Sequence, residues 1–164
     1  MKSALVLPSS TYQKLLLEEA SLNEYIGLDP AELTAAATLA ANLYGQGRIA
    51  EARTIFEGLT ALDRDFYLGY AGLGAIELVE GHLDSALSNL TRAADLNPGD
   101  ASVQTNLGEA LLQRAEFSRA CQCFERALAL DPTCEDPGAN RARAIIEGLR
   151  QATGLTREGP DQAA

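Results

Sequence analysis

Three cysteines and one histidine are the side chains of this sequence whose types most readily suggest chemistry. Cys121, Cys123 and Cys134 are odd in number and late in the chain, which does not fit a disulfide framework. The single histidine, His82, follows a glycine in an expected turn, and one distant histidine supplies too few ligands for a zinc site with these cysteines. We therefore expect reduced thiols, no metal, no cofactor and no enzyme activity.

Carboxylates and glycines also have structural explanations. Three aspartates lie at expected helix boundaries, where capping accounts for them: Asp29, Asp100 and Asp131. Gly69, Gly72 and Gly74 look like a phosphate-binding loop, but they lie inside an expected helix with no strand before it, so close helix packing explains them better. The net charge of -10 opposes binding to nucleic acid and to anionic membranes.

The elements that would position these side chains follow a period of 34 residues. The aligned columns are Leu39, Leu73 and Leu107; Ala40, Gly74 and Gly108; Ala52, Ala86 and Ala120; Phe56, Leu90 and Phe124; and Leu59, Ala93 and Ala127. Small residues let two antiparallel helices approach closely, while the large residues fill the space between neighbouring pairs. The turn between the two helices falls at Gly47, Gly81 and Ala115. This pattern resembles the tetratricopeptide repeat and predicts an all-α solenoid of three repeats, an N-terminal helix and a C-terminal capping helix.

The repeat pattern also predicts boundaries along the chain. We expect a disordered N-terminus at 1–9, an N-terminal helix at 10–28, repeats at 33–66, 67–100 and 101–134, a capping helix at 135–152 and a disordered tail at 153–164. Within the repeats, helices are expected from Asp29-Pro30 to Tyr44 and at 49–62, 66–80, 83–96, 101–114 and 117–130, and the last helix is expected at 138–152. The helix at 10–28 has a broad apolar side, which needs cover either from its own array or from a second subunit in a homodimer.

The first helix of each repeat is expected to line a concave surface. Its inward positions are mostly small and apolar, and tyrosines supply rims with a polar tip. The predicted peptide-binding groove consists of Thr34, Ala37, Ala41, Tyr44, Tyr67, Leu68, Tyr70, Ala71, Ala75, Leu78, Val79, Ser102, Thr105, Glu109 and Leu112. Such a surface suits an extended peptide with spaced apolar anchors.

The charges are divided between the two kinds of helix. The first helices carry Glu32, Glu77, Glu80 and Glu109, and the second helices carry Arg53, Arg92, Arg119 and Arg126. This division favours a client with basic residues beside its apolar anchors.

Several short stretches carry a more specific resemblance. They are Leu43-Tyr44-Gly45-Gln46-Gly47, Glu51-Ala52 with Phe56, Leu62-Asp63, Gly72-Leu73-Gly74-Ala75 and Glu109-Ala110-Leu111-Leu112. With the chain's length and acidity, they resemble the class II translocator chaperones of bacterial type III secretion systems. The resemblance implies a cytoplasmic protein that holds a segment of a hydrophobic pore-forming subunit in its concave groove before export, and that often dimerises through its N-terminal part.

A general repeat adaptor that assembles a protein complex is the alternative. The best-known adaptors bind a C-terminal carboxylate through Lys, Asn and Arg, and the corresponding positions here are Ala37, Ala41, Gly72, Ser102 and Asn106, of which only Asn106 suits that role. The apolar stretch at 4–7 is stopped by Pro8 and is too short for a signal sequence or a membrane span, so we expect a soluble protein that does not insert into membranes.

Overall fold

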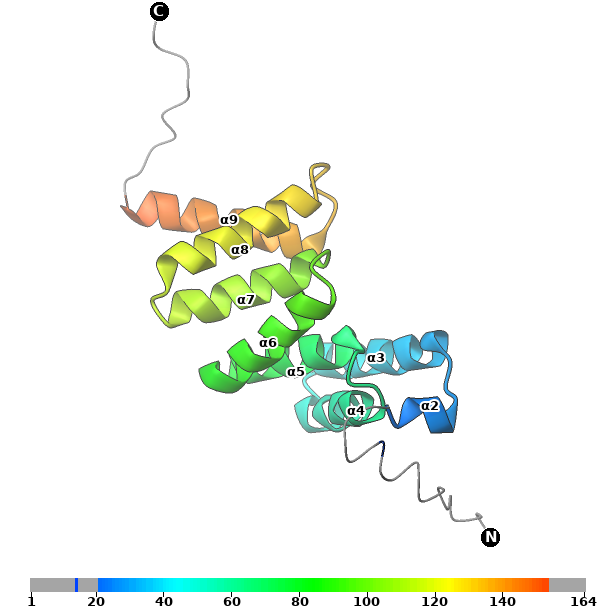
Figure 1. The fold of residues 1–164 in the computed structure, drawn as a ribbon. Helices are drawn as coiled ribbons and strands as arrows, with labels where there is room; N and C mark the ends of the chain where they lie inside the picture. Colours follow the sequence, from blue (N-terminus) through cyan, green and yellow to red (C-terminus); the bar gives the residue numbers. More distant parts are fainter. Residues whose placement is uncertain (1–13, 15–20, 154–164) are drawn as a thin grey trace, which may run out of the picture.

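The computed structural model describes residue 14 and residues 21–153, and the regular structure of this part is entirely α-helical (Figure 1). The helices are α2 (Asn23–Ile26), α3 (Pro30–Gly45), α4 (Ile49–Leu62), α5 (Tyr67–Glu80), α6 (Leu83–Leu96), α7 (Ala101–Gln113), α8 (Phe117–Leu130) and α9 (Pro137–Thr153). From α3 onward each helix begins and ends within one residue of the expected position. Most of the expected helix at 10–28, the expected disorder at 1–9 and the tail after Thr153 lie outside the described residues.

The helices form three antiparallel pairs that follow one another along the array (Figure 1). We call α3, α5 and α7 the A helices and α4, α6 and α8 the B helices. Each B helix packs against the A helix of the next pair, and neighbouring A helices also touch. The last helix, α9, packs against both α7 and α8, so it takes the place that a fourth A helix would occupy. The fold is therefore an α-solenoid of three repeats closed by a C-terminal capping helix.

The turn inside each pair is the same in all three repeats. Backbone N–H groups of Arg48, His82 and Glu116 each donate to a carbonyl five residues earlier, at 2.9 Å. This bond closes the A helix as a Schellman motif, which requires a left-handed residue just before the donor. Gly47 and Gly81 supply it with φ of 79° and 80°, and in the third repeat Ala115 adopts φ 60° in spite of its Cβ.

Small residues on the A helices accept large side chains from the B helices. A Cβ added at Gly74 would lie 2.6 Å from Leu90, and one added at Gly108 would lie 2.6 Å from Phe124. The third member of the small column, Ala40, is completely buried. In the second and third repeats, the small column of the A helix and the large column of the B helix are thus contacts between the two helices of a pair.

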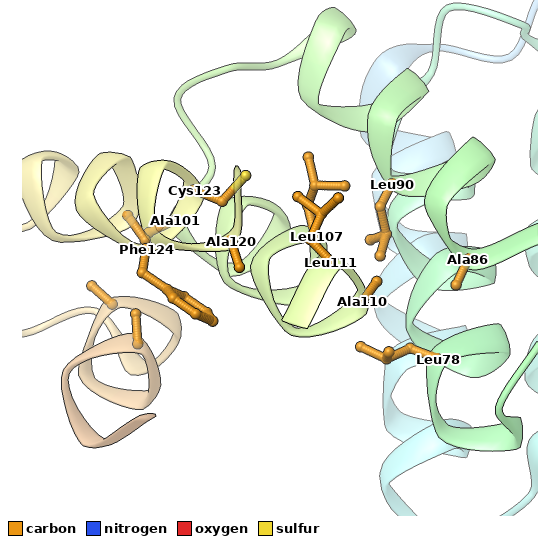
Figure 2. Packing of buried hydrophobic residues seen from close by; sticks show 13 residues of the cluster. Leu78, Ala86, Leu90, Ala101, Leu107, Ala110, Leu111, Ala120, Cys123 and Phe124 are labelled. Carbon is orange, nitrogen blue, oxygen red and sulfur yellow. The ribbon is translucent and has the colours of Figure 1, made fainter. Parts of the chain in front are cut away.

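Two hydrophobic clusters run through the array. One joins α3 and α4 to α5, and the other joins Leu78 of α5 to α6, α7, α8 and α9. Figure 2 shows the second cluster, in which Leu90 of α6 lies beside Leu107 and Leu111 of α7. Each cluster crosses from one pair into the next, which explains why a single pair would leave much of its apolar surface in water.

The expected caps are present at two of the three aspartates. Asp29 forms a capping box with Glu32, and Asp100 accepts a hydrogen bond from the backbone N–H of Val103 at 3.0 Å. Asp131 does not cap the start of a helix: it lies at the C-terminal end of α8 and is buried. Its carboxylate accepts from the backbone N–H of Glu135 at 3.0 Å and from Arg143 of α9 at 3.1 Å, so it ties α9 to the array.

Candidate functional site

Fifteen residues were predicted for the groove. Ten of them lie on the A helices with side chains that are exposed or half-buried, and the two tyrosines Tyr67 and Tyr70 are described separately below. The ten are Thr34, Ala41, Tyr44, Leu68, Ala71, Ala75, Val79, Ser102, Glu109 and Leu112. Val79 is the most exposed large apolar residue of the described chain, at 70%. Apart from Glu109 these side chains are small, hydroxylated or apolar, so this surface can offer apolar contact at several points along an extended segment.

Three predicted groove residues lie inside the array. Ala37, Leu78 and Thr105 are buried. The hydroxyl of Thr105 donates to the carbonyl of Gly138 at 2.9 Å, so the start of α9 covers it. These three residues position the A helices, and they leave the accessible surface to their neighbours.

The two predicted rim tyrosines lie in different places. Tyr70 faces the B helices, because the guanidinium of Arg92 on α6 lies 6.0 Å from the centre of its ring. Tyr67 contributes to a cavity of about 580 Å³ at the loops that precede α7 and α9. Burial raises the pKa of the Tyr67 phenol above its ordinary value, so it stays protonated and can donate a hydrogen bond.

The carboxylates of the A helices already have partners within the chain. Glu77 and Glu80 both bind Arg53 of α4, and Glu109 lies 2.7 Å from Arg141 of α9. The carboxylate of Glu32 accepts a hydrogen bond from the backbone N–H of Asp29 in the capping box. These pairs neutralise much of the acidity that we expected to attract a basic client.

Glu77, Glu80 and His82 form the one cluster of possible metal ligands within residues 21–153, with ligand atoms that all lie within 4.8 Å of one another. Arg53 already binds both carboxylates, and Nδ1 of His82 lies 2.9 Å from Glu77. The hydrogen bond from Arg53 holds the pKa of Glu77 below its ordinary value, with a smaller effect of His82. The cluster is therefore explained as an ion pair that ties α4 to α5.

The three cysteines differ in exposure. Cys121 and Cys134 are exposed, and Cys123 is buried against α7. Burial raises the pKa of the Cys123 thiol, so it stays protonated at neutral pH and is a poor nucleophile. None of the helices described here is both long and apolar enough to cross a lipid bilayer.

Comparison with known proteins agrees with this architecture. A family model described as tetratricopeptide repeat matches residues 78–146. Two curated proteins match in sequence: an FK506-binding protein-like protein of Mus musculus, 28% identical over 54% of the chain, and the chloroplastic tetratricopeptide repeat domain-containing protein PYG7 of Arabidopsis thaliana, 33% identical over 43% of it. The chain spans only about a quarter of the length of these relatives, 25% and 23%.

Solved structures match over more of both chains. The translocator chaperone SycD of Yersinia enterocolitica superposes with a TM-score of 0.64 and 22% identity, over 79% of this chain and 98% of SycD. PcrH in complex with the chaperone-binding region of PopB gives 0.61 and 27%, over 73% and 98%. PcrH with the corresponding region of PopD gives 0.65 and 26%, over 77% and 97%. The chain is therefore similar in fold to the translocator chaperone SycD and to PcrH, and its residues 78–146 match the tetratricopeptide-repeat model.

Proposed function

We propose that this chain is a cytoplasmic chaperone that holds an extended segment of a secreted, hydrophobic translocator protein before type III export. The observation that carries the proposal is the match over nearly the whole length of PcrH, which was solved with the chaperone-binding regions of two different proteins, PopB and PopD. A binder that covers an aggregation-prone segment lowers the amount of that segment exposed to water by mass action.

The surface we assign to the client is the accessible side of the A helices. Small residues such as Ala41, Ala71 and Ala75 leave room for apolar side chains of the client, and Tyr44 and Leu112 flank them with larger apolar surface. Because the carboxylates of this side are already paired, apolar contact rather than net charge would provide most of the affinity.

The test places a carboxylate on this surface. Ala41→Glu changes an exposed residue of α3, and Ala75→Glu changes a half-buried residue of α5. Each should weaken binding of the client at least about tenfold, because a carboxylate would be desolvated against an apolar anchor. Ala50→Glu on α4 is the matched control, since it makes the same change at an exposed position on a B helix.

The client is first identified by mass spectrometry of what co-purifies with the chain from its own cells, and each variant is then titrated with that protein. Circular dichroism checks that the variants melt like the parent. A membrane-active secreted client whose binding is lost in Ala41→Glu and kept in Ala50→Glu supports the proposal. Unchanged binding in both A-helix variants would place the client elsewhere.

The general adaptor is the second candidate function. It is favoured by the two curated relatives, whose matches cover a repeat segment within much longer proteins. Co-purification of a soluble multiprotein complex, with no membrane-active secreted protein, would decide for it. The carboxylate-binding form of adaptor is further disfavoured, because Asn106 accepts a hydrogen bond from Arg141 and is already engaged.

A further inference from the structure

A cavity of about 660 Å³ lies between the B helices α6 and α8, with α7 as its floor. Gln104, Leu107 and Leu111 form the floor, Asp95 lies on the α6 wall and Arg126 on the α8 wall. None of the residues predicted for the client groove lines it. The cavity is therefore separate from the surface assigned to the client, and what it binds does not depend on the proposed function.

The preceding repeat shows what fills the equivalent position. Tyr70 is the equivalent of Gln104 one period earlier, and Arg92 is the equivalent of Arg126. In that repeat the guanidinium of Arg92 lies 6.0 Å from the centre of the Tyr70 ring and 2.8 Å from the carboxylate of Asp65. A large aromatic residue is typical of this position in the repeat.

The third repeat has lost both partners of that arginine. The ring of Tyr70 is replaced by the amide of Gln104, and Asp65 is replaced by Gly99, which has no side chain. Within the described residues no carboxylate forms an ion pair with Arg126.

The side chain of Gln104 also lacks a hydrogen bond. Its side chain is 2% exposed, and its Oε1 has no hydrogen-bond partner. A buried acceptor without a donor costs free energy, and so does the space that a missing ring leaves in a packed array. A ligand that supplied a ring, a hydroxyl donor and a carboxylate would remove these costs together.

We propose that the cavity between α6 and α8 binds a tyrosine side chain of a partner protein, with an aspartate or glutamate next to that tyrosine. The ring occupies the space that Tyr70 fills in the second repeat. The phenol O–H donates to Oε1 of Gln104, and the neighbouring carboxylate pairs with Arg126.

The charged residues around the cavity determine how the bound segment is oriented. Arg119 on α8 is already paired with Glu116 at 2.5 Å, which leaves Arg126 as the guanidinium available to the ligand. Asp95 on the α6 wall repels a second carboxylate there. The acidic residue of the partner therefore lies on the α8 side of the bound ring.

The probe is a capped hexapeptide with Tyr-Glu at its centre and Gly and Ser around it. One side-chain anchor gives weak binding, with a dissociation constant on the order of 1 mM, so the titration is followed by ¹⁵N chemical shifts of the protein. Shifts should concentrate on α6, α7 and α8. The Phe-Glu peptide should bind about fivefold more weakly, because it lacks the hydroxyl donor, and so should the Tyr-Gln peptide, because it lacks the charge.

The protein variants test the same contacts from the other side. Gln104→Tyr repeats the arrangement of the second repeat and should abolish binding while raising the melting temperature. Arg126→Gln should remove the preference for Tyr-Glu over Tyr-Gln. Glu125→Gln is the control, because Glu125 is exposed on α8 next to Arg126 and does not line the cavity.

Three results would overturn the proposal: no saturable shifts with the Tyr-Glu peptide, equal binding of all three peptides, or unchanged binding in Gln104→Tyr. Shifts confined to α3 and α5 would assign the peptide to the client surface. Loss of client binding in Ala41→Glu leaves these titrations unaffected, so the two sites succeed or fail separately.

Discussion

At the scale of single residues, the packing of the array depends on glycines, because the missing Cβ leaves room for a side chain of a neighbouring helix. A Cβ added at Gly72 of α5 would lie 2.3 Å from the end of the Phe56 ring, and Phe56 is buried between α4 and α5. A Cβ added at Gly58, in the middle of α4, would meet nothing within 4 Å. The two glycines lie in neighbouring helices, and the same substitution has opposite consequences at each.

Gly72→Ala should destabilise the protein by about 1–2 kcal/mol, because Phe56 has to shift and the gain in helix propensity does not offset the strain. Gly58→Ala should stabilise it by about 0.5–1 kcal/mol, since an exposed helical alanine loses less entropy on folding. Urea denaturation followed by circular dichroism gives both free energies of unfolding. Two shifts of the same sign would show that the contact at Phe56 is not tight.

The sequence was sufficient to interpret the three glycines of α5. Close packing was predicted from their place in a helix, and Cβ atoms at Gly69, Gly72 and Gly74 would meet Thr60, Phe56 and Leu90. Tyr70 was expected on the rim of the groove, whereas it faces Arg92 of α6. Its partner Arg92 comes from the following helix, and the period alone does not say which side of α5 faces that helix.

At the scale of helices, ion pairs join each repeat to the next. Arg53 of α4 binds Glu77 and Glu80 of α5, Arg114 reaches Asp84 at 2.7 Å, and Arg143 of α9 binds Asp131. The pairs of Arg53 with Glu80 and of Arg114 with Asp84 are exposed and contribute little. Glu77 is the exception among the A-helix carboxylates, because it is 9% exposed and binds both Arg53 and His82.

Glu77→Gln should lower the free energy of unfolding by about 1–3 kcal/mol at pH 7, because Arg53 and His82 lose a charged acceptor. The folded pKa of Glu77 is lowered, so its contribution is present above the unfolded pKa and is lost as the pH falls through the folded value. The difference between parent and variant should therefore shrink in acid. Melting temperatures from pH 7 down to about pH 3 measure it.

Glu125→Gln is the control for this series, because Glu125 is an exposed carboxylate on α8 and should change stability little at any pH. A Glu77 deficit that stays constant from neutral to acidic pH would mean that packing, and not charge, explains the loss.

The helices themselves were predictable, because a period of 34 residues fixes the small and large positions of each pair and the turn between them. The state of their charged residues was not. Glu77, Glu80 and Glu109 looked like free carboxylates on one surface, but their partners Arg53 and Arg141 lie far from them in the sequence. Only the packed array shows that they are paired with arginines.

At the scale of the whole molecule, the two ends of the array differ. The last repeat is covered by α9, whose Ala139 and Ala142 are completely buried. The first repeat is not covered in the same way by the described residues. Leu39 of α3 is 54% exposed, although its equivalents Leu73 and Leu107 are 9% and 8% exposed.

The rest of that side of α3 repeats the contrast. Ala35 and Asn42 are exposed, whereas the equivalent positions in α5 and α7 are buried: Gly69 and Val103, and Ile76 and Ala110. In α5 and α7 this side packs on the preceding pair. The sequence predicted an apolar helix just before α3, at 10–28, and a helix at that place in the chain is suited to cover Leu39 either within one subunit or across a homodimer.

The cover can be tested by combining two changes. Leu39→Lys in the 164-residue chain should lower the melting temperature, because it would place a charge beneath the expected helix at 10–28. Removing residues 1–20 should lower it as well. In the shortened chain Leu39→Lys should cause no further loss, since the group that it disturbs is already gone, so the two changes should be strongly non-additive.

Light scattering after size exclusion decides between the two kinds of cover. If a second subunit provides it, either change converts a dimer into a monomer, whereas a cover within one subunit leaves the oligomeric state unchanged. Thr38→Lys on the same helix is the control, because its side chain is exposed and its hydroxyl bonds only to the carbonyl of Thr34 in the preceding turn. Losses that simply add would show that residues 1–20 and Leu39 do not touch, and the exposed side of α3 would then be open to a different partner.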